Sequence, residues 1–395
     1  MAHSHARTRL VAGVMTGTSL DGADAAVVRV DGSGLAMRAG VLGSWSGGLG
    51  GAGEGLRRAA AGERLTALEF GKLGRALALA CAEAVRAAMN AAGVGRVGLV
   101  AAHGQTVAHK PPVSVQVLNG SVLAREVGAP VVFDLRAADL AAGGEGAPIT
   151  PIADAVLFGG GDAGRVVVNL GGFVNATVLP TGRLGDAGYA ERVKAFDVCA
   201  CNHVLNRAAV RGWGSAFDEG GARAAGAEPV SGAVDAVAAV LRGQAERTGA
   251  GRSLGRTDEA HATLDGLLAS HDAAAVARSS AEAIAAVVVD RIADAVRAGA
   301  GVVLAGGGAR NAALAGAIGR RAEELGGAVV LSDELGVGVS EREAAAMAVL
   351  GALCADGAAI TLPGVTGCGA PAPIAGVWAP DPTGSGGAPK GMVER

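Results

Sequence analysis

Two pairs of apolar segments, each joined by a short glycine-containing turn, constrain the fold more than any other feature of the sequence. Residues 9–15 and 23–31 are predicted strands that flank the turn sequence TGTSLDG, and residues 165–170 and 173–179 flank a Gly-Gly pair. Helical and strand-like segments follow each hairpin, although the two halves share no evident sequence identity. This recurring pattern predicts an α/β protein with two lobes and a cleft between them, where ligands usually bind.

The chain is also long enough for two cores, because 395 residues exceed what one ordinary core accommodates. We expect lobe I to comprise residues 1–140, with residues 360–395 packing back on it, and lobe II to comprise residues 141–359. The polar, Gly/Pro-rich tail beyond residue 380 is expected to be loose. The further predicted elements are helices at 64–93, 280–299 and 341–357, strands at 97–102, 130–134 and 327–331, and a strand running into a glycine turn at 301–311.

The composition excludes several classes of protein. Hydrophobic residues make up 50% of the chain and aromatic residues only 3%, which indicates a packed core of Ala, Val and Leu rather than disorder. A net charge of −3 without a long basic stripe makes nucleic acid a poor partner, and no apolar run is long enough to span a bilayer. Five cysteines, an odd number, do not fit a disulfide framework, and Asp21 and Asp24 follow the first apolar run too soon for a secretory signal. We therefore expect a cytoplasmic protein.

Three glycine-rich turns could bind parts of a nucleotide. MTGTSLDG at 15–22 offers backbone N–H groups, three hydroxyls and Asp21, which could bind Mg²⁺. A plain hairpin turn, with Asp21 bonded to its own backbone, would explain the same residues, and no Walker A lysine follows. NLGGFVN at 169–175 is a second candidate phosphate turn, and GGGARN at 306–311 could let a nucleotide base or ribose lie against bare backbone. Simple strand connections would also explain both segments. Three such turns at strand ends of two α/β lobes together favour nucleotide binding.

Two further segments carry polar side chains near predicted strand ends. HGQT at 103–106 places the imidazole of His103 after a strand, where it could contact a ligand or make a structural hydrogen bond. Arg136 and Asp139 lie beside a Gly-rich loop in the segment DLRAADLAAGGEGAP, where a surface ion pair is the alternative to a ligand-binding role. The residue types alone are consistent with both the ligand-binding and the structural interpretation of His103 and Arg136.

The segment AFDVCACN at 195–202 allows three roles for Asp197. It could be a catalytic carboxylate, or a metal ligand beside Cys199, Cys201 and His203, or the N-cap of a helix that begins near Cys199. A structural zinc site needs four ligands at wider spacing, and no second Cys/His cluster supplies the fourth. A cap would not exclude catalysis, because a helix N-terminus also favours the ionised carboxylate that a base requires.

Taken together, these segments resemble the anhydro-N-acetylmuramic acid kinase family from about residue 10 to residue 380. Their order and spacing match that family as well as their residues do. The resemblance implies a ribonuclease H-like fold of the sugar kinase, Hsp70 and actin class, with two lobes and ATP in the cleft between them. The matching segments are TGTSLDGADAA (16–26), HGQTVAHKP (103–111), VVFDLRAADLAAGGEGAP (131–148), VNLGGFVNAT (168–177), AFDVCACN (195–202), LAGGGARNAAL (304–314), DELG (333–336), EREAAAMA (341–348) and LPGVTGC (362–368).

The resemblance implies a kinase that uses ATP and Mg²⁺ and acts on an anhydrosugar. In this family, water attacks C1 of 1,6-anhydro-N-acetylmuramic acid as the bridge opens, and the freed O6 takes the γ-phosphate of ATP, which gives N-acetylmuramic acid 6-phosphate during cell-wall recycling. Asp197 matches the catalytic base, and a homodimer is a further expectation. The other implied site residues are Gly17, Thr18, Ser19, Asp21 and Gly22 in the first phosphate turn, with Asp21 also the Mg²⁺ ligand; Gly171, Gly172 and Asn175 in the second phosphate turn; Gly306, Gly307, Gly308 and Asn311 in the nucleoside turn; and His103, Arg136 and Glu343 beside the sugar.

One segment departs from the family pattern. The family usually has Asp-Thr-Gly-Pro-Gly-Asn where this chain has Asp-Val-Cys-Ala-Cys-Asn at 197–202, and Glu145 stands where Gln is common. The base and the Asn are retained, but the loop that aims the base is altered. A kinase for levoglucosan, a smaller anhydrosugar, is therefore the alternative enzyme. A non-catalytic sensor of nucleotide or sugar is the alternative outside enzymes, although a sensor has no need of Asp197.

Overall fold

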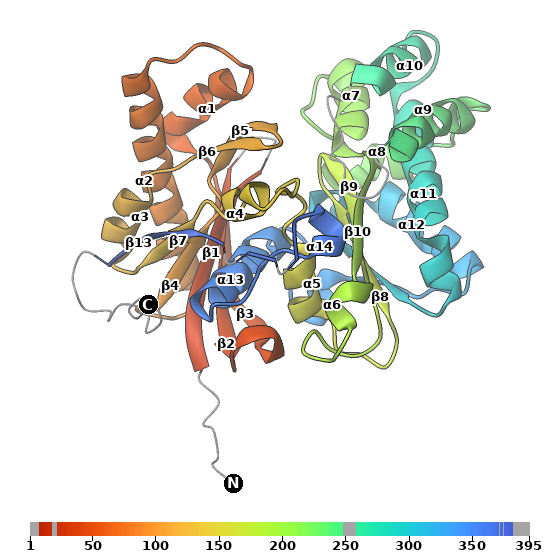
Figure 1. Cartoon of the computed structure of the whole chain (residues 1–395). Coiled ribbons are helices and arrows are strands. Elements are labelled where there is room, and N and C mark those ends of the chain that lie inside the picture. The colour runs from red at the N-terminus through yellow and green to blue at the C-terminus, as the bar shows by residue number, and fades with distance from the viewer. Residues whose placement is uncertain (1–7, 18–21, 248–257, 371, 374, 382–395) are drawn as a thin grey trace. The chain divides into compact units, whose positions relative to one another are not determined.

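The computed structural model describes residues 8–17, 22–247, 258–370, 372–373 and 375–381 (Figure 1). The chain divides into two compact units. Unit 1 comprises Met1–Gly160, Arg183–Glu191 and Glu341–Arg395, and unit 2 comprises Gly161–Gly182 and Arg192–Ser340. Residues 141–160, 183–191 and 341–359, which were expected in lobe II, therefore belong to unit 1. Most of the tail that was expected to be loose lies outside the described residues.

Unit 1 is built around a six-stranded sheet in the order β13-β7-β4-β1-β2-β3. The first predicted hairpin is confirmed, because β1 and β2 pair antiparallel, and β3 adds to β2 in the same sense. On the other side of β1, β4 and β7 run parallel to it, and β13 pairs antiparallel with β7 at the edge. The strands are β1 (Thr8–Thr16), β2 (Ala23–Asp31), β3 (Arg38–Gly47), β4 (Leu99–Ala102), β7 (Val131–Phe133) and β13 (Val377–Ala379).

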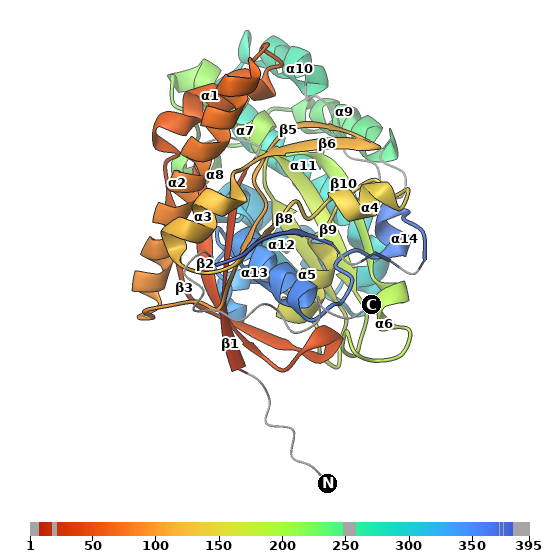
Figure 2. The same cartoon turned by 60° about the vertical axis from the view of Figure 1, so that its left-hand side comes forward.

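Two long helices, α2 (Ala67–Ala91) and α13 (Arg342–Ala355), cover opposite faces of this sheet (Figure 2). Successive residues of a strand point to opposite faces. Ala12 of β1 belongs to the apolar cluster that contains α2, whereas a Cβ on Gly13 would lie 1.9 Å from the carbonyl oxygen of Ala344 in α13. Glycine at position 13 therefore lets α13 approach β1 backbone to backbone.

Local sequence signals set the ends of α2. The Thr66 hydroxyl accepts the N–H of Glu69 and the Glu69 carboxylate accepts the N–H of Thr66, which is a capping box. Gly93, at φ 66°, follows the C-terminal end, as predicted. The other elements of unit 1 are η1 (Gly34–Ala36), η2 (Gly50–Ala52), α1 (Gly53–Ala60), β5 (Gln105–Lys110), β6 (Val113–Val117), α3 (Gly120–Val127), α4 (Ala137–Ala141), α5 (Pro151–Phe158) and α14 (Pro363–Thr366), and α6 (Tyr189–Arg192) lies at its boundary with unit 2.

Unit 2 contains a five-stranded sheet in the order β10-β9-β8-β11-β12. The second predicted hairpin is confirmed, because β8 and β9 pair antiparallel; β10 continues that sense, and β11 and β12 add in parallel on the other side of β8. Each unit thus has three antiparallel strands that continue into parallel ones, which confirms the predicted duplicated α/β, ribonuclease H-like fold. The strands are β8 (Arg165–Leu170), β9 (Phe173–Leu179), β10 (Lys194–Ala200), β11 (Gly301–Ala305) and β12 (Val329–Leu331).

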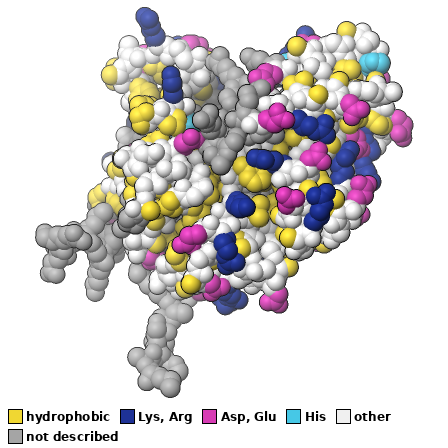
Figure 3. All heavy atoms as spheres, turned by 45° about the vertical axis from the view of Figure 1, so that its right-hand side comes forward, with side chains coloured by type: hydrophobic (Ala, Val, Ile, Leu, Met, Phe, Trp, Pro, Cys, Tyr) yellow, Lys and Arg dark blue, Asp and Glu magenta, His cyan; other side chains and the backbone are white. Residues whose placement is uncertain are grey.

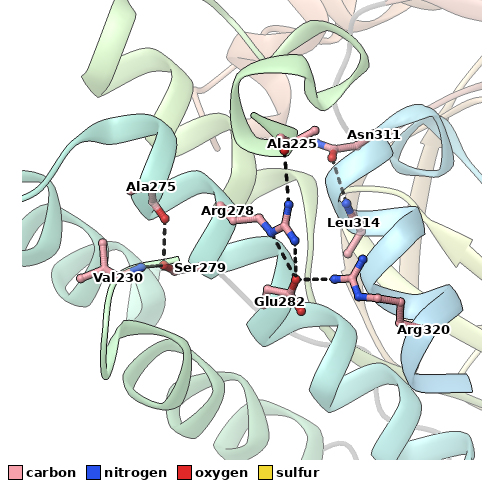
Figure 4. Close-up of polar contacts among 9 residues, drawn as sticks. All are labelled: Ala225, Val230, Ala275, Arg278, Ser279, Glu282, Asn311, Leu314 and Arg320. Atoms are coloured by element: carbon pink, nitrogen blue, oxygen red, sulfur yellow. Dashed lines mark hydrogen bonds and ion pairs between the residues drawn. The ribbon is translucent and has the colours of Figure 1, made fainter. Parts of the chain in front are cut away.

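The helices of unit 2 pack around α11 (Ala273–Arg297), which contacts α7, α9 and α12. A shared carboxylate ties α11 to α12: the Glu282 side chain accepts hydrogen bonds from Arg278, one turn earlier, and from Arg320 on α12, as Figure 4 shows. Arg278 also donates to the Ala225 carbonyl at the end of α8. The other helices are α7 (Asn202–Trp213), α8 (Ala222–Ala225), α9 (Ala233–Arg247), α10 (Asp258–Leu268) and α12 (Ala312–Glu324), with the short η3 (Glu219–Gly221), η4 (Gly307–Arg310) and η5 (Ser332–Leu335).

On the face drawn in Figure 3, basic and acidic side chains lie interspersed. In unit 2, Arg207 forms an ion pair with Asp265, and Arg242 with Asp290. Among the described residues, the structure has no helix long and apolar enough to cross a membrane.

Candidate active site

Asp197 lies in a strand and does not cap a helix. β10 pairs antiparallel with β9, with Asp197 opposite Asn175, and the register shifts immediately after Asp197. The helix-cap interpretation is wrong, because α7 begins at Asn202 and the cap position is held by Cys201, whose side chain makes no capping bond. Strand pairing with β9 continues through Asp197 and holds its backbone extended.

Asn175 holds the Asp197 carboxylate from the neighbouring strand. Its Nδ2 donates to Oδ1 of Asp197 over 2.5 Å, and its own Oδ1 accepts from Nδ2 of Asn169 over 3.5 Å. Asn169 and Asn175 face each other in the pairing of β8 with β9. The amide therefore sets the direction of a carboxylate that is only partly buried. Such a carboxylate can take a proton from a bound water molecule.

The second phosphate turn and the nucleoside turn lie against each other within unit 2. A Cβ on Gly306 or on Gly308 would come within 2.8 Å of the Leu170 carbonyl oxygen, and Gly306 has φ 84°. Packing alone therefore requires glycine at these two positions. At Gly307 no atom lies within 4 Å of where a Cβ would be, so its backbone is open to a ligand.

His203 packs against the second phosphate turn. A Cβ on Gly172 would lie 2.7 Å from Nε2 of His203, and the His203 ring meets the Phe173 ring edge-on with centroids 5.4 Å apart. The N–H of Cys201 donates to the Gly172 carbonyl over 2.9 Å, and that of Asn202 to the Gly171 carbonyl over 3.1 Å. The two residues that follow β10 thus bind the turn, which places the turn beside the strand that carries Asp197.

The two thiols of this segment are buried in the apolar core of unit 2. Burial raises the pKa of Cys201 to about 12 and that of Cys199 well above its ordinary value, so both are protonated thiols at neutral pH. Zinc binds thiolates rather than thiols. Across the described part of the chain, the structure has no cluster of three or more His, Cys, Asp or Glu side chains able to hold a metal ion.

Asn311 has a structural partner. Its Oδ1 accepts the N–H of Leu314 over 3.1 Å and so caps α12 (Figure 4). A Cβ on Gly221, which has φ 66°, would lie 2.1 Å from the same oxygen, so the chain of η3 passes directly over the Asn311 amide. Any contact between Asn311 and a nucleoside would come in addition to this cap.

In unit 1, His103 and Arg136 are hydrogen-bonded to each other. His103 follows β4; its Nδ1 donates to the Gly104 carbonyl over 2.9 Å, and its Nε2 accepts from Nε of Arg136 over 2.9 Å. Desolvation, reinforced by the Arg136 charge, lowers the pKa of His103 to about 3, so the imidazole is neutral. Desolvation also lowers the pKa of Arg136, to about 10, which leaves it charged at neutral pH. The surface ion-pair interpretation of Arg136 is wrong, since Arg136 instead bonds His103 and, through Nη1, the Gly146 carbonyl over 2.6 Å.

Glu343 lies in the first turn of α13, within electrostatic range of Arg136, because its charge raises the pKa of that guanidinium. It also acts on Asp24 of β2, whose pKa is raised by burial first and by Glu343 and Glu341 next. Asp24 was not among the site residues predicted from the sequence. The signal that could have found it is its place two residues after the turn, on the opposite face of β2 from Ala23 and Ala25, which pack in the cluster that contains α2.

Only the two ends of the first phosphate turn lie within the described part of the chain. Gly17 and Gly22 are described, and a Cβ on Gly22 would lie 2.5 Å from the Gly47 carbonyl oxygen of β3. The expected roles of Thr18, Ser19 and Asp21 fall on residues outside the described part of the chain.

Comparison with known proteins decides the family. A family model described as "Anhydro-N-acetylmuramic acid kinase" matches residues 9–380. The chain belongs to the anhydro-N-acetylmuramic acid kinase family. A curated member from Salinibacter ruber is 34% identical over 405 residues, which cover 96% of this chain and 98% of that protein. Another, from Cupriavidus pinatubonensis, is 35% identical and covers 93% of this chain and 97% of its own length.

Solved structures resemble the chain more distantly. The activator of the 2-hydroxyisocaproyl-CoA dehydratase from Clostridium difficile, with bound ADPNP, is 15% identical, with a TM-score of 0.43 over 87% of this chain and 94% of that chain. A ROK hexokinase from Thermus thermophilus is also 15% identical, with a TM-score of 0.35 over 86% of this chain and 97% of its own. Likeness at this level says nothing about substrate.

Proposed function

We propose that this protein is an ATP-dependent kinase that opens 1,6-anhydro-N-acetylmuramic acid with water and phosphorylates O6, giving N-acetylmuramic acid 6-phosphate. Membership of the family over residues 9–380 supports the activity. The observation that carries the mechanism is the carboxylate of Asp197, oriented by the Asn175 amide on the neighbouring strand. A non-catalytic sensor would have no use for such a group.

Asp197 is the base. It takes a proton from water as the water oxygen bonds to C1 and the C1–O6 bond breaks. The freed O6 then bonds to the γ-phosphorus of ATP, whose bond to the β-phosphate oxygen breaks to release ADP. A positioned base contributes about 10²–10⁴-fold to such a step. The hydrogen bond from Asn175 stabilises the ionised form of Asp197, which is the form that accepts the proton.

The glycine turns hold the nucleotide. Gly17 to Gly22, with Thr18 and Ser19, and the turn at Gly171 and Gly172 with Asn175 bind the phosphates. In the second turn the N–H of Gly171 is already used, because it donates to the Phe173 carbonyl over 3.1 Å. Gly307, whose backbone is open, accepts the nucleoside, with Gly306 and Gly308 shaping the turn and Asn311 capping the helix that follows. This assignment is supported by the direct contact between the two turns of unit 2.

Asp21 would hold Mg²⁺, which neutralises phosphate charge when bound. The chemistry of the neighbouring groups fits a hard cation, because Asp24 and Glu343 bring further carboxylates to the described edge of the same turn. The carboxylates of this chain give that edge of the first phosphate turn a negative charge. Burial is the main cause of the raised pKa of Asp24, and the negative charges of Glu343 and Glu341 raise it further.

Arg136, His103 and Glu343 face the sugar. The lactyl group of muramic acid carries a carboxylate, and Arg136 supplies the cation for it. His103 stays neutral and accepts a hydrogen bond from Arg136, so it orients the guanidinium without adding charge. Glu343 adds an acceptor for sugar hydroxyls.

We further propose that the enzyme is cytoplasmic and serves cell-wall recycling, with an anhydrosugar and ATP as its ligands and nucleic acid and membranes not among its partners. Five buried free thiols support a reducing compartment. The homodimer stays a prediction, which light scattering of the purified protein would test.

A substrate panel tests the function. With ATP and Mg²⁺, kcat/KM from ADP release should be far higher for 1,6-anhydro-N-acetylmuramic acid than for levoglucosan, because each buried group left unpaired by the smaller sugar costs about 1–3 kcal/mol. Equal values, or a preference for levoglucosan, would show that the Cys-Ala-Cys segment marks a change of substrate. Binding of both ligands without any turnover would favour the sensor.

A further inference from the structure

Asp139, in the short helix α4 just after Arg136, has a completely buried carboxylate. Burying a charge is costly unless hydrogen bonds compensate it. Hydrogen bonds compensate it here, because Oδ2 accepts the N–H of Gly146 over 2.7 Å and Oδ1 accepts the hydroxyl of Thr366 over 2.7 Å. Thr366 belongs to the LPGVTGC segment, for which the proposed reaction has no role, so its contact with Asp139 needs an explanation.

These contacts fix the loop at residues 144–146. The N–H of Gly144 donates to the Asp139 carbonyl over 2.9 Å, and the N–H of Glu145 donates to the Thr366 carbonyl over 2.8 Å. A Cβ on Gly144 would lie 2.2 Å from Oδ2 of Asp139, and Gly146 has φ 67°. The loop is therefore wound tightly around the carboxylate, as only glycine at these two positions permits.

The same loop holds Arg136. The carbonyl of Gly146 accepts Nη1–H of Arg136 over 2.6 Å, while the N–H of the same residue binds Asp139. Nε of Arg136 donates to Nε2 of His103 over 2.9 Å. Two of the five N–H groups of the guanidinium are thus committed to fixed acceptors, which sets the plane and direction of the remaining ones.

We propose that Asp139, together with Thr366, is a positioning residue: it fixes the 144–146 loop so that the Gly146 carbonyl and His103 aim Arg136 at the carboxylate of the sugar substrate. The inference rests on the proposed function only in assigning that carboxylate to Arg136. The chain of contacts from Thr366 through Asp139 and Gly146 to Arg136 lies entirely within unit 1.

Three variants and a control test the inference. Thr366→Val removes the hydrogen bond to Asp139 with little change in side-chain size, whereas Thr366→Ser keeps the hydroxyl that makes it. Asp139→Ala removes the carboxylate and with it its hydrogen bonds to Gly146 and Thr366. Asp356→Ala is the matched control, because Asp356 pairs with Arg9 at the far end of α13 and its loss should lower stability without touching the loop.

The first measurement needs no activity. In protein with ¹⁵N-labelled histidine, the Nε2 shift of His103, assigned with His103→Gln, reports the hydrogen bond from Arg136. We expect this chemical shift to differ from the wild-type value in Thr366→Val and Asp139→Ala. It should keep the wild-type value in Thr366→Ser and Asp356→Ala. An unchanged shift in folded Thr366→Val overturns the inference, even where Asp139→Ala fails to fold.

The second measurement is kinetic. KM for 1,6-anhydro-N-acetylmuramic acid should rise about threefold in Thr366→Val and tenfold or more in Asp139→Ala, with KM for ATP unchanged and Thr366→Ser like the wild type. The same KM should be insensitive to Asp356→Ala. Equal rises in both KM values would indicate a general loss of structure and would overturn the positioning role. If the wild type does not turn over this sugar at all, the proposed function fails, while the histidine shift still decides the inference.

Discussion

The amide of Asn175 decides where the Asp197 carboxylate points, and this gives a prediction at the scale of one residue. Asp197→Asn should lower kcat about 10²-fold or more, because it removes proton acceptance, while the Asn side-chain oxygen can still accept from Asn175. Binding of ATP and sugar, measured by calorimetry, should stay near normal. Asp290→Asn, on the exposed surface, is the control. Turnover close to wild type in Asp197→Asn would remove Asp197 from the mechanism.

The neutral state of His103 gives a second prediction at this scale, on pH. The pKa of His103 is about 3 in the folded protein and about 6.5 when unfolded, so the unfolded chain binds the extra proton between these values. The stability that neutral His103 provides is therefore complete above about pH 6.5 and is lost as the pH falls toward 3.

Denaturant unfolding at pH 7 and at pH 5 measures this dependence. The wild type should lose up to about 2 kcal/mol more than His103→Gln over that interval, because Gln does not titrate. If the two proteins lose the same amount, His103 is not held neutral by its surroundings.

At the scale of the element, α13 begins with a buried ion pair. Nε of Arg342 donates to Oδ1 of Asp154 over 2.8 Å, and the side chains are 3% and 0% exposed. Asp154→Ala should cost about 3–5 kcal/mol of unfolding free energy, because it leaves a buried guanidinium without its carboxylate. Replacing both with apolar residues, in Asp154→Leu/Arg342→Met, should recover much of the loss.

Denaturant unfolding compares these variants with Asp290→Ala, which removes an exposed pair with Arg242 and should cost under about 1 kcal/mol. A loss in Asp154→Ala no larger than in Asp290→Ala would mean that the buried pair does not anchor α13.

Sequence patterns predicted the elements whose signals are local. Both hairpins, α2 with its terminal Gly93, and α13 have alternating or helical spacing and clear turn residues at their ends. β3 was missed because RAGVLGSWSG is glycine-rich and lacks a strand pattern; it forms because β2 pairs with it. β10 was likewise taken for the approach to a helix, since only its pairing with β9 shows that Asp197 is extended.

The site divides in the same way. The glycine turns and Asp197 were proposed from motifs, and their roles in binding and catalysis stay predictions. The hydrogen bond of His103 to Arg136, and the burial of Asp139, could not, because they join segments that only the folded sheet brings together. No local pattern encodes a contact between residues 139 and 366.

At the scale of the whole molecule, nucleotide binding should appear as stability. A ligand at 100 times its Kd adds about 2.7 kcal/mol to the free energy of unfolding. A non-hydrolysable ATP analogue with Mg²⁺ should therefore raise the melting temperature, and Asp21→Ala should lose the part of the rise that depends on Mg²⁺. Asp31→Ala, at the other end of β2, should keep it. A Mg²⁺-dependent rise that survives in Asp21→Ala would leave Asp21 as a turn residue only.

The contact between Gly13 and Ala344 has a consequence during synthesis. The two residues pack together, yet they are made roughly 20–70 s apart at ribosomal rates of about 5–20 residues per second. Through that interval one face of β1 awaits the helix that will cover it, whereas unit 2, which ends at Ser340, is complete before α13 has been translated. All residues of unit 2 are therefore available to fold while one face of β1 is still without the helix that covers it.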